Sequence, residues 1–123
     1  MDLRRFMKSN ELTKLQHDLA EFASERDWDK FHSPKNLSMA MSVEAGELVE
    51  IFQWLTEEES SSLTQKQQLR AEEEIADVFL YLLRIADKLN VDLIQIAKNK
   101  IAINAEKYPV EACYSSAAKY SDL

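Results

Sequence analysis

The scarcity of glycine and proline is the feature that most restricts how this chain can fold. One glycine and two prolines occur in 123 residues. Strands joined by tight turns need more of both, because glycine supplies positive φ angles and proline presets turn geometry. A few long helices need neither. We therefore predict an all-α protein.

Apolar residues recur at spacings of about three, four and seven, as the buried face of a helix requires. They predict a first helix that starts near residue 2 or near residue 10 and ends near residue 26. Three further helices are predicted at about 36–55, 65–89 and 92–107, the last capped by Asp92. The expected fold is a four-helix bundle with short loops.

Breaks in the helical pattern define the loops and the domain. Pro34 disfavours helix at and before its own position, and the polar stretch at 56–64, TEEESSSLT, indicates a surface loop. No linker divides the chain, so we predict a single domain over residues 1–123. Its core is expected at about residues 10–110, followed by a tail at 111–123.

The charge and hydropathy of the chain exclude several classes of protein. Acidic residues outnumber basic ones by 22 to 15, and no basic stripe with interleaved aromatics is present to bind nucleic acid. No apolar run approaches the ~18 residues of a membrane span, and the N-terminus lacks the apolar part of a signal peptide. The single Cys113 cannot form an internal disulfide framework. We expect a cytoplasmic protein without nucleic acid or membrane partners.

Glu44 lies where a core-facing side chain is expected. At about 100° per residue, the apolar residues of the segment 36–55 form one stripe, with Glu44 near its centre and Glu47 at its edge. An isolated buried carboxylate is costly and normally takes up a proton or finds a partner. The position of Glu44 therefore needs a partner from elsewhere in the fold.

The segment 65–89 supplies candidates for that partner, because Glu74, Asp77 and Tyr81 line one flank of its helix. Two helices that each carry a pair of acids three residues apart can direct four carboxylates at one cation. Oxygen ligands select hard ions, so Mg²⁺ is expected, with Mn²⁺ as a possible substitute. Acidic pairs at this spacing are also common on exposed faces, so periodicity leaves a solvated face as an alternative.

A di-iron site is a weaker alternative. Such bundles need E-x-x-H on two helices. His17 falls in the first predicted helix and His32 in a loop. We expect both to be ordinary surface or loop histidines.

The segment 65–89 also predicts association. Leu80 and Leu83 make its middle apolar nearly all round, which indicates burial on more than one side and hence a partner subunit. Its main apolar stripe consists of Ala71, Ile75, Val78, Leu82, Ile85 and Leu89.

Several stretches of the chain resemble the MazG-like all-α nucleoside triphosphate pyrophosphohydrolases, and the dCTP pyrophosphatase branch in particular. They are RDWDKFHSPKNL at 26–37, EAGELVEIFQW at 44–54, EEIADVFLYLLRIAD at 73–87, VDL at 91–93 and NAEKYPV at 104–110. The ending, AAKYSDL, is similar too, and the resemblance covers about residues 12–123.

This resemblance implies Mg²⁺-dependent cleavage of a deoxynucleoside triphosphate between its α and β phosphates. The products would be a monophosphate and pyrophosphate, and the role would be to clear unwanted nucleotides from the dNTP pool. The expected substrate is dCTP or a modified dCTP. The implied assembly is a homotetramer built as a dimer of dimers, with sites shared between subunits.

The resemblance also implies roles for individual residues. The implied metal ligands are Glu44, Glu47, Glu74 and Asp77. The implied substrate-binding residues are Trp28, Trp54, Tyr81, Lys100 and Asn104. Glu44 or Glu47 is the candidate that takes the proton of the attacking water, with Glu73 as a further option.

One departure from the branch bears on specificity. Leu19 stands where relatives can carry a histidine that faces the base, and His17 lies about 200° away on the same helix. Strict preference for cytosine is therefore in doubt, and dUTP, dATP or a phosphoribosyl nucleotide are alternative substrates. The remaining alternative is a helical oligomerisation or interaction module without catalysis.

Overall fold

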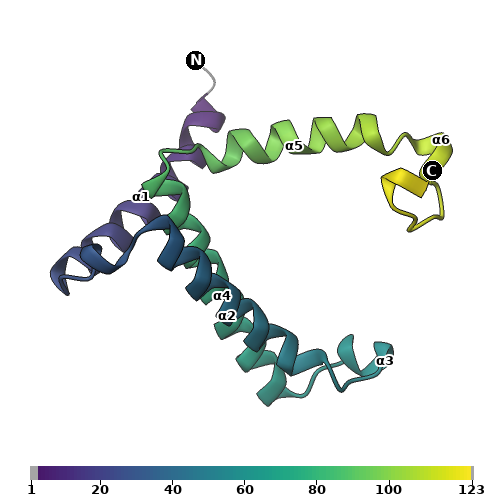
Figure 1. Ribbon diagram of the computed structural model, residues 1–123, viewed down its shortest axis with the longest axis horizontal. Helices are drawn as coiled ribbons and strands as arrows, with labels where there is room; N and C mark the ends of the chain where they lie inside the picture. The colour runs from purple at the N-terminus through teal and green to yellow at the C-terminus, as the bar shows by residue number, and fades with distance from the viewer. Residues whose placement is uncertain (1–2, 123) are drawn as a thin grey trace. The chain divides into compact units, whose positions relative to one another are not determined.

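The computed structural model describes the backbone of residues 3–122 and the side chains of residues 11–119, 121 and 122. Within that part of the chain every regular element is helical (Figure 1). The long helices are α1 (Leu3–Glu25), α2 (Pro34–Phe52), α4 (Gln65–Lys88) and α5 (Leu93–Lys107). The short ones are η1 (Asp29–Phe31), α3 (Glu57–Ser60), α6 (Val110–Cys113) and η2 (Tyr120–Asp122). The predicted all-α class is confirmed, and all the predicted long helices are present.

The chain divides into two compact units, residues 1–90 and 91–123. In the first unit α2 runs along α4, which is the most extensive pairing among the described helices, and α1 also contacts α4. Figure 1 shows α2 and α4 side by side over most of their lengths. Among the side chains described in this unit, the buried ones are Ala23, Leu37, Ile51, Ala71, Leu83, Arg84 and Ala86.

The start of α2 corrects one expectation. Pro34 was predicted to disfavour helix, yet it is the first residue of α2. At that position its missing N–H costs nothing, because the first N–H groups of a helix have no partner within the helix. Ser33 precedes it as the N-cap, and its hydroxyl accepts a hydrogen bond from the Asn36 N–H at 3.1 Å.

The predicted loop at 56–64 is also partly helical. Thr56 and Glu59 form a reciprocal capping box that starts α3, and Thr64 forms the same motif with Gln67 at the start of α4. The polar composition of this stretch therefore supports two helix starts rather than an irregular loop.

The junction after α4 follows the sequence signals. Asn90 adopts a positive φ of 56° directly after the C-cap Leu89, a conformation that asparagine tolerates better than most residues. In the second unit, Asp92 caps α5 as predicted, and its carboxylate accepts from the Gln95 N–H at 3.0 Å. None of the described helices is long and apolar enough to cross a membrane.

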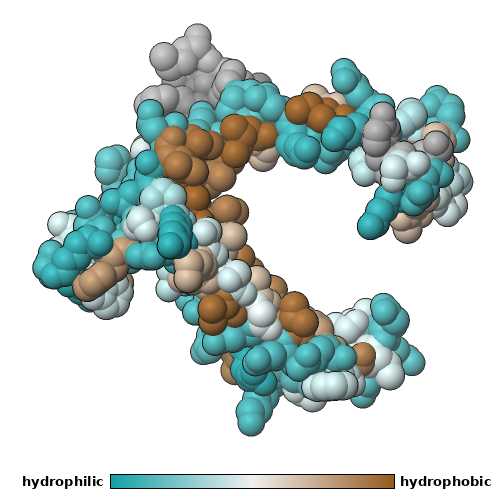
Figure 2. All heavy atoms as spheres, viewed as in Figure 1, coloured by the Kyte–Doolittle hydropathy of each residue, from teal (hydrophilic) through white to brown (hydrophobic). Residues whose placement is uncertain are grey.

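The apolar stripe predicted for α4 is only partly buried by this chain. Ala71 is buried, but Ile75 is 56% and Leu82 is 40% exposed, while Leu83 is 0% exposed. Phe79 lies on the same exposed face at helical spacing. Figure 2 shows apolar side chains at the surface of the paired helices. The reason is that α2 covers one side of α4 and leaves the neighbouring side to solvent.

Candidate functional site

Three carboxylates from two helices meet between α2 and α4. Glu44 of α2 faces Glu74 and Asp77 of α4, and ligand oxygens of the three lie within 4.8 Å of one another. Glu74 and Asp77 share a face because residues three apart on a helix are neighbours. We call Glu44, Glu74 and Asp77 the acidic cluster.

Glu47 lies at the edge of this arrangement. It is one turn along α2 from Glu44, and it contributes to the environment of Glu44 by hydrogen bonding and by its charge. It is not within the close group of three. The structure thus brings together three of the four predicted metal ligands and places the fourth beside them.

The acidic cluster shifts the protonation of Glu44. Hydrogen bonding with Glu74, burial, and the hydrogen bond and charge of Glu47 together raise the pKa of Glu44 from 4.5 to about 7. Like charges held this close disfavour a second ionised carboxylate. Without a cation, the carboxyl group of Glu44 is therefore partly protonated at neutral pH.

One buried carboxylate oxygen of the cluster accepts no hydrogen bond from the described residues. Glu74 Oε2 is buried and receives no hydrogen bond from any residue that the structure describes. Such an atom is costly unless a proton or a cation satisfies it. An oxygen-only donor set with an orphaned buried oxygen fits a hard divalent cation.

The metal-free protein should become less stable as the pH rises from about 4.5 to about 7. In this window the folded state keeps a proton on Glu44 that the unfolded state has released, so a rising pH favours unfolding. Thermal melting in excess chelator at a series of pH values measures the effect. Glu44→Gln is the matched control, because it removes the titrating group.

The difference in melting temperature between wild type and Glu44→Gln isolates Glu44 from other titrating residues. The pKa of His32 is lowered in the folded state. Its titration therefore makes the protein more stable as the pH rises toward its ordinary pKa of 6.5, which is opposite to the effect of Glu44. If the melting temperatures of wild type and Glu44→Gln change in parallel with pH across this window, the prediction is contradicted.

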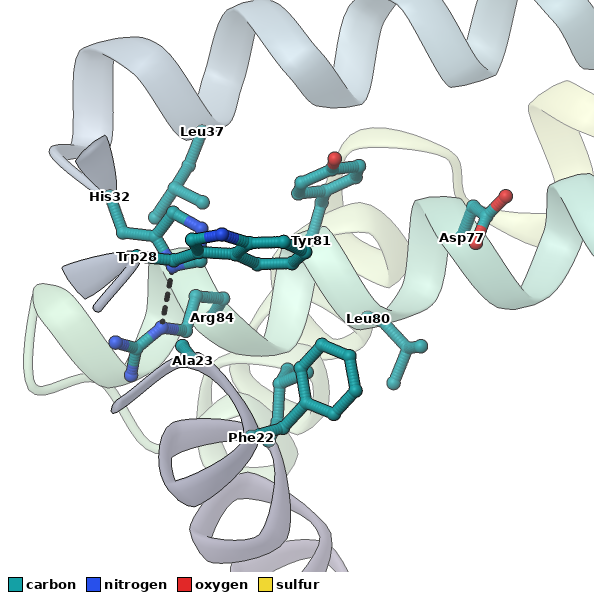
Figure 3. Close-up of a pocket in the computed structure, with 10 residues that line it drawn as sticks. Phe22, Ala23, Trp28, His32, Leu37, Asp77, Leu80, Tyr81 and Arg84 are labelled. Atoms are coloured by element: carbon teal, nitrogen blue, oxygen red, sulfur yellow. Dashed lines mark hydrogen bonds between the residues drawn. The ribbon is translucent and has the colours of Figure 1, made fainter. Parts of the chain in front are cut away.

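An aromatic pocket has Asp77 of the acidic cluster in its wall (Figure 3). It is a cavity of about 290 Å³ in the first unit. Its walls come from α1, the loop that contains η1, α2 and α4: Leu19, Phe22, Ala23, Trp28, His32, Leu37, Asp77, Leu80, Tyr81 and Arg84. Asp77 belongs to both the cluster and the pocket wall, so the two features share a residue.

Aromatic side chains give the pocket its character. Trp28 packs edge-on against Phe22, with ring centroids 5.7 Å apart and an interplanar angle of 71°. Trp28 remains 44% exposed, so part of its indole is open to a ligand. Tyr81 lies one turn along α4 from Asp77 (Figure 3). A planar ring can stack in this pocket while a polar extension reaches the carboxylates.

The other predicted substrate residues lie elsewhere in the chain. Trp54 follows the end of α2, is 86% exposed and takes no part in the pocket wall. Lys100 and Asn104 lie in α5, in the second unit, where both are exposed. Their roles in binding stay predictions.

Two polar residues of the pocket wall, His32 and Arg84, were not identified from the sequence as part of the site. His32 was expected to be an ordinary loop histidine, yet it lines the pocket and accepts a hydrogen bond from buried Arg84. A signal for Arg84 was present, since it is a lone cation in the apolar run LYLLRIA at 80–86. A charge in such a run predicts a buried, paired group.

The fold and site define a helical protein with a carboxylate cluster beside an aromatic ligand pocket. Sequence comparison then assigns the family: the chain belongs to the MazG-like family, whose sequence model matches residues 39–123. The predicted family is confirmed.

Curated relatives cover most of the chain. It is similar to dCTP pyrophosphatase 1 of Mus musculus, with 40% identity over 121 residues, or 97% of this chain and 71% of the relative. The Bos taurus protein of the same name is 44% identical over 106 residues, or 85% of this chain and 63% of the relative. The Homo sapiens protein is 42% identical over 106 residues, or 85% and 62%. The chain thus spans between 62% and 71% of the length of these relatives.

A solved structure has the same fold. A pyrophosphatase from Archaeoglobus fulgidus superposes with a TM-score of 0.76 at 40% sequence identity. The match covers 80% of this chain and 93% of that protein.

Proposed function

We propose that this protein is a divalent-metal-dependent nucleoside triphosphate pyrophosphohydrolase. It hydrolyses a deoxynucleoside triphosphate between the α and β phosphates and releases a monophosphate and pyrophosphate. The names of the curated relatives support dCTP as the first substrate to test. The chemistry fits a role in clearing unwanted nucleotides from the dNTP pool of the cytoplasm.

The observation that carries the proposal is that Asp77 is shared by two features of the site. This residue belongs to the acidic cluster and to the wall of the aromatic pocket. A nucleobase stacked on Trp28 would therefore place the phosphate end of the same nucleotide toward the carboxylates. Stacking of a base on an aromatic side chain is worth about 1–3 kcal/mol in other systems.

The acidic cluster also explains the need for a cation. The chain carries a net charge of −7, and carboxylates alone would repel a triphosphate. Mg²⁺, or Mn²⁺ in its place, held by the carboxylates of Glu44, Glu47, Glu74 and Asp77 would neutralise charge on the phosphates. Glu44 or Glu47 then accepts the proton of the water that attacks phosphorus.

The wall of the pocket on the side of α1 is apolar and contributes little to base preference. Leu19 lines the pocket and supplies no hydrogen bond to distinguish one base edge from another. Apolar contacts discriminate weakly between similar ligands. The proposal therefore places dCTP or a modified dCTP first, with dUTP and dATP as the substrates to compare.

The proposal extends to assembly. Ile75, Phe79 and Leu82 form an exposed apolar face on α4. Such a face fits burial against a second copy, in a homo-oligomer of the tetrameric type implied by the family resemblance. Trp54, Lys100 and Asn104 would complete the substrate site in that assembly. Light scattering coupled to size-exclusion chromatography measures the oligomeric state.

The test is a substrate panel. The purified protein is incubated with each common dNTP and with dUTP, in Mg²⁺, in Mn²⁺ or in excess chelator. We expect equimolar monophosphate and pyrophosphate in the presence of metal, fastest with dCTP, and none with chelator. Orthophosphate and a diphosphate would show cleavage of the wrong bond and overturn the proposal. No turnover of any nucleotide, with no thermal shift on adding metal, would favour a non-catalytic interaction module.

A further inference from the structure

Arg84 is a buried cation, and each of its three guanidinium nitrogens donates a hydrogen bond. It is 5% exposed, and its side chain lines the aromatic pocket. Its Nε donates to His32 Nδ1 at 3.2 Å, and one terminal nitrogen donates to Asp87 at 3.3 Å. The other terminal nitrogen donates to Asp29. Figure 3 shows the bond between Arg84 and His32 at the edge of the pocket.

The direction of this bond determines the protonation of His32. Arginine has no acceptor and keeps its protons, so Nδ1 of His32 must be the acceptor and cannot carry a proton. The neutral ring then carries its proton on Nε2. An imidazolium would place two N–H groups against each other. Burial, followed by the charges of Arg84 and Lys88, lowers the pKa of His32 against the opposing effect of Asp29.

The same network holds the loop that carries the ring. Asp29 is shared between Arg84 and Lys88, whose Nζ lies 2.7 Å from the carboxylate. The backbone N–H of His32 donates to the Asp29 carbonyl at 3.0 Å. This segment follows Trp28 directly, so the last turns of α4 orient the imidazole and anchor the chain next to the indole.

The remaining nitrogen of His32 is free to serve a ligand. His32 lines the pocket, and no residue that the structure describes accepts a hydrogen bond from Nε2. The pocket-lining groups that α1 and α2 contribute on either side of this loop (Leu19, Phe22, Ala23 and Leu37) are apolar. A polar donor among them would be selective for the acceptor edge of a planar ligand.

We propose that Arg84 is a positioning residue that holds His32 as the neutral Nε2–H tautomer, so that the pocket keeps one fixed hydrogen-bond donor for a carbonyl or ring-nitrogen acceptor of the bound nucleobase. The nucleobase as ligand rests on the proposed function; the tautomer does not. Arg84 touches no reacting atom and acts only through His32.

Nitrogen NMR of the imidazole rings tests the tautomer directly. The chain has two histidines, so His17→Gln assigns the signals. We expect wild-type His32 to show an unprotonated Nδ1 and a protonated Nε2 from about pH 6 to about pH 8. Arg84→Lys should give an averaged mixture of tautomers, because an ammonium cannot serve the two carboxylates and the ring in this fork geometry.

A matched control separates tautomer control from plain stabilisation. Asp87→Asn weakens an ion pair of the same guanidinium but leaves the Arg84–His32 bond in place. It should lower the melting temperature without changing the tautomer. The proposal is overturned if His32 already averages its tautomers in the wild type, or if Arg84→Lys leaves them unchanged.

Kinetics test the consequence for substrate. Arg84→Lys should raise KM for the best nucleotide by roughly 2- to 10-fold, as expected for one neutral hydrogen bond, with little change in kcat. His32→Gln keeps an N–H donor without a tautomer, so adding Arg84→Lys to it should change KM no further. Additive effects in the double variant would contradict the proposal. A protein that turns over no nucleotide would refute the proposed function while the NMR result still decides the role of Arg84.

Discussion

Replacing Asp77 by asparagine is expected to reduce kcat by at least about 100-fold. Changes to groups that merely support metal ligands already cost about 10- to 100-fold, and Asp77 is a proposed ligand itself. Asparagine keeps the shape of the pocket wall but removes the negative charge. Steady-state pyrophosphate release over a range of Mg²⁺ concentrations measures the loss.

Stability measurements distinguish this effect from unfolding. Asp77→Asn relieves repulsion in the acidic cluster, so the metal-free variant should melt at or above the wild-type temperature. It should also lose most of the stabilisation that added Mg²⁺ gives. Glu72→Gln, an exposed position on the same helix, is the control and should retain full activity. Wild-type turnover in Asp77→Asn, or an equal loss in Glu72→Gln, would refute the assigned role.

Replacing Leu83 by alanine is expected to lower the free energy of unfolding by about 2–5 kcal/mol, the usual cost of a Leu→Ala change in a core. Leu83 is 0% exposed on the helix that contacts both α1 and α2. Urea denaturation followed by circular dichroism measures the change.

Leu82→Ala is the informative comparison. Leu82 is 40% exposed within one chain, so it should cost much less than Leu83→Ala in a monomer. A large cost for Leu82→Ala that depends on protein concentration would show that a second copy covers this face of α4. If Leu82→Ala and Leu83→Ala lower the free energy of unfolding equally at every protein concentration, the description of this side of α4 as open in the single chain is contradicted.

Most helix positions could be predicted because helical periodicity is a local property. The boundaries that differed involve capping. Pro34 was read as a helix breaker, although Ser33 before it provides the N-cap that makes proline favourable as the first helical residue. Thr56 and Glu59 likewise carry the spacing of a capping box inside a stretch interpreted as loop.

The candidate site was predictable in part. A carboxylate in the middle of an apolar stripe identified Glu44, and spacing identified Glu74 and Asp77. The pKa of about 7 at Glu44 was not predictable, because it depends on how closely α2 and α4 bring these side chains together. From the sequence, Trp28 and Trp54 were both predicted to bind substrate. Only packing against Phe22 and α4 places Trp28 in the pocket wall and leaves Trp54 86% exposed.

The sequence by itself determined the helical class, the faces of the helices and the pairs of acidic residues on them, because these follow from a repeat of about 3.6 residues per turn. Only the tertiary structure decided which of these side chains meet. The bond between Arg84 and His32 joins residues 52 positions apart, and it exists because the fold brings a buried Arg84 of α4 against a partly buried His32 in the loop after α1. This contact between distant parts of the chain places a loop histidine in the pocket wall.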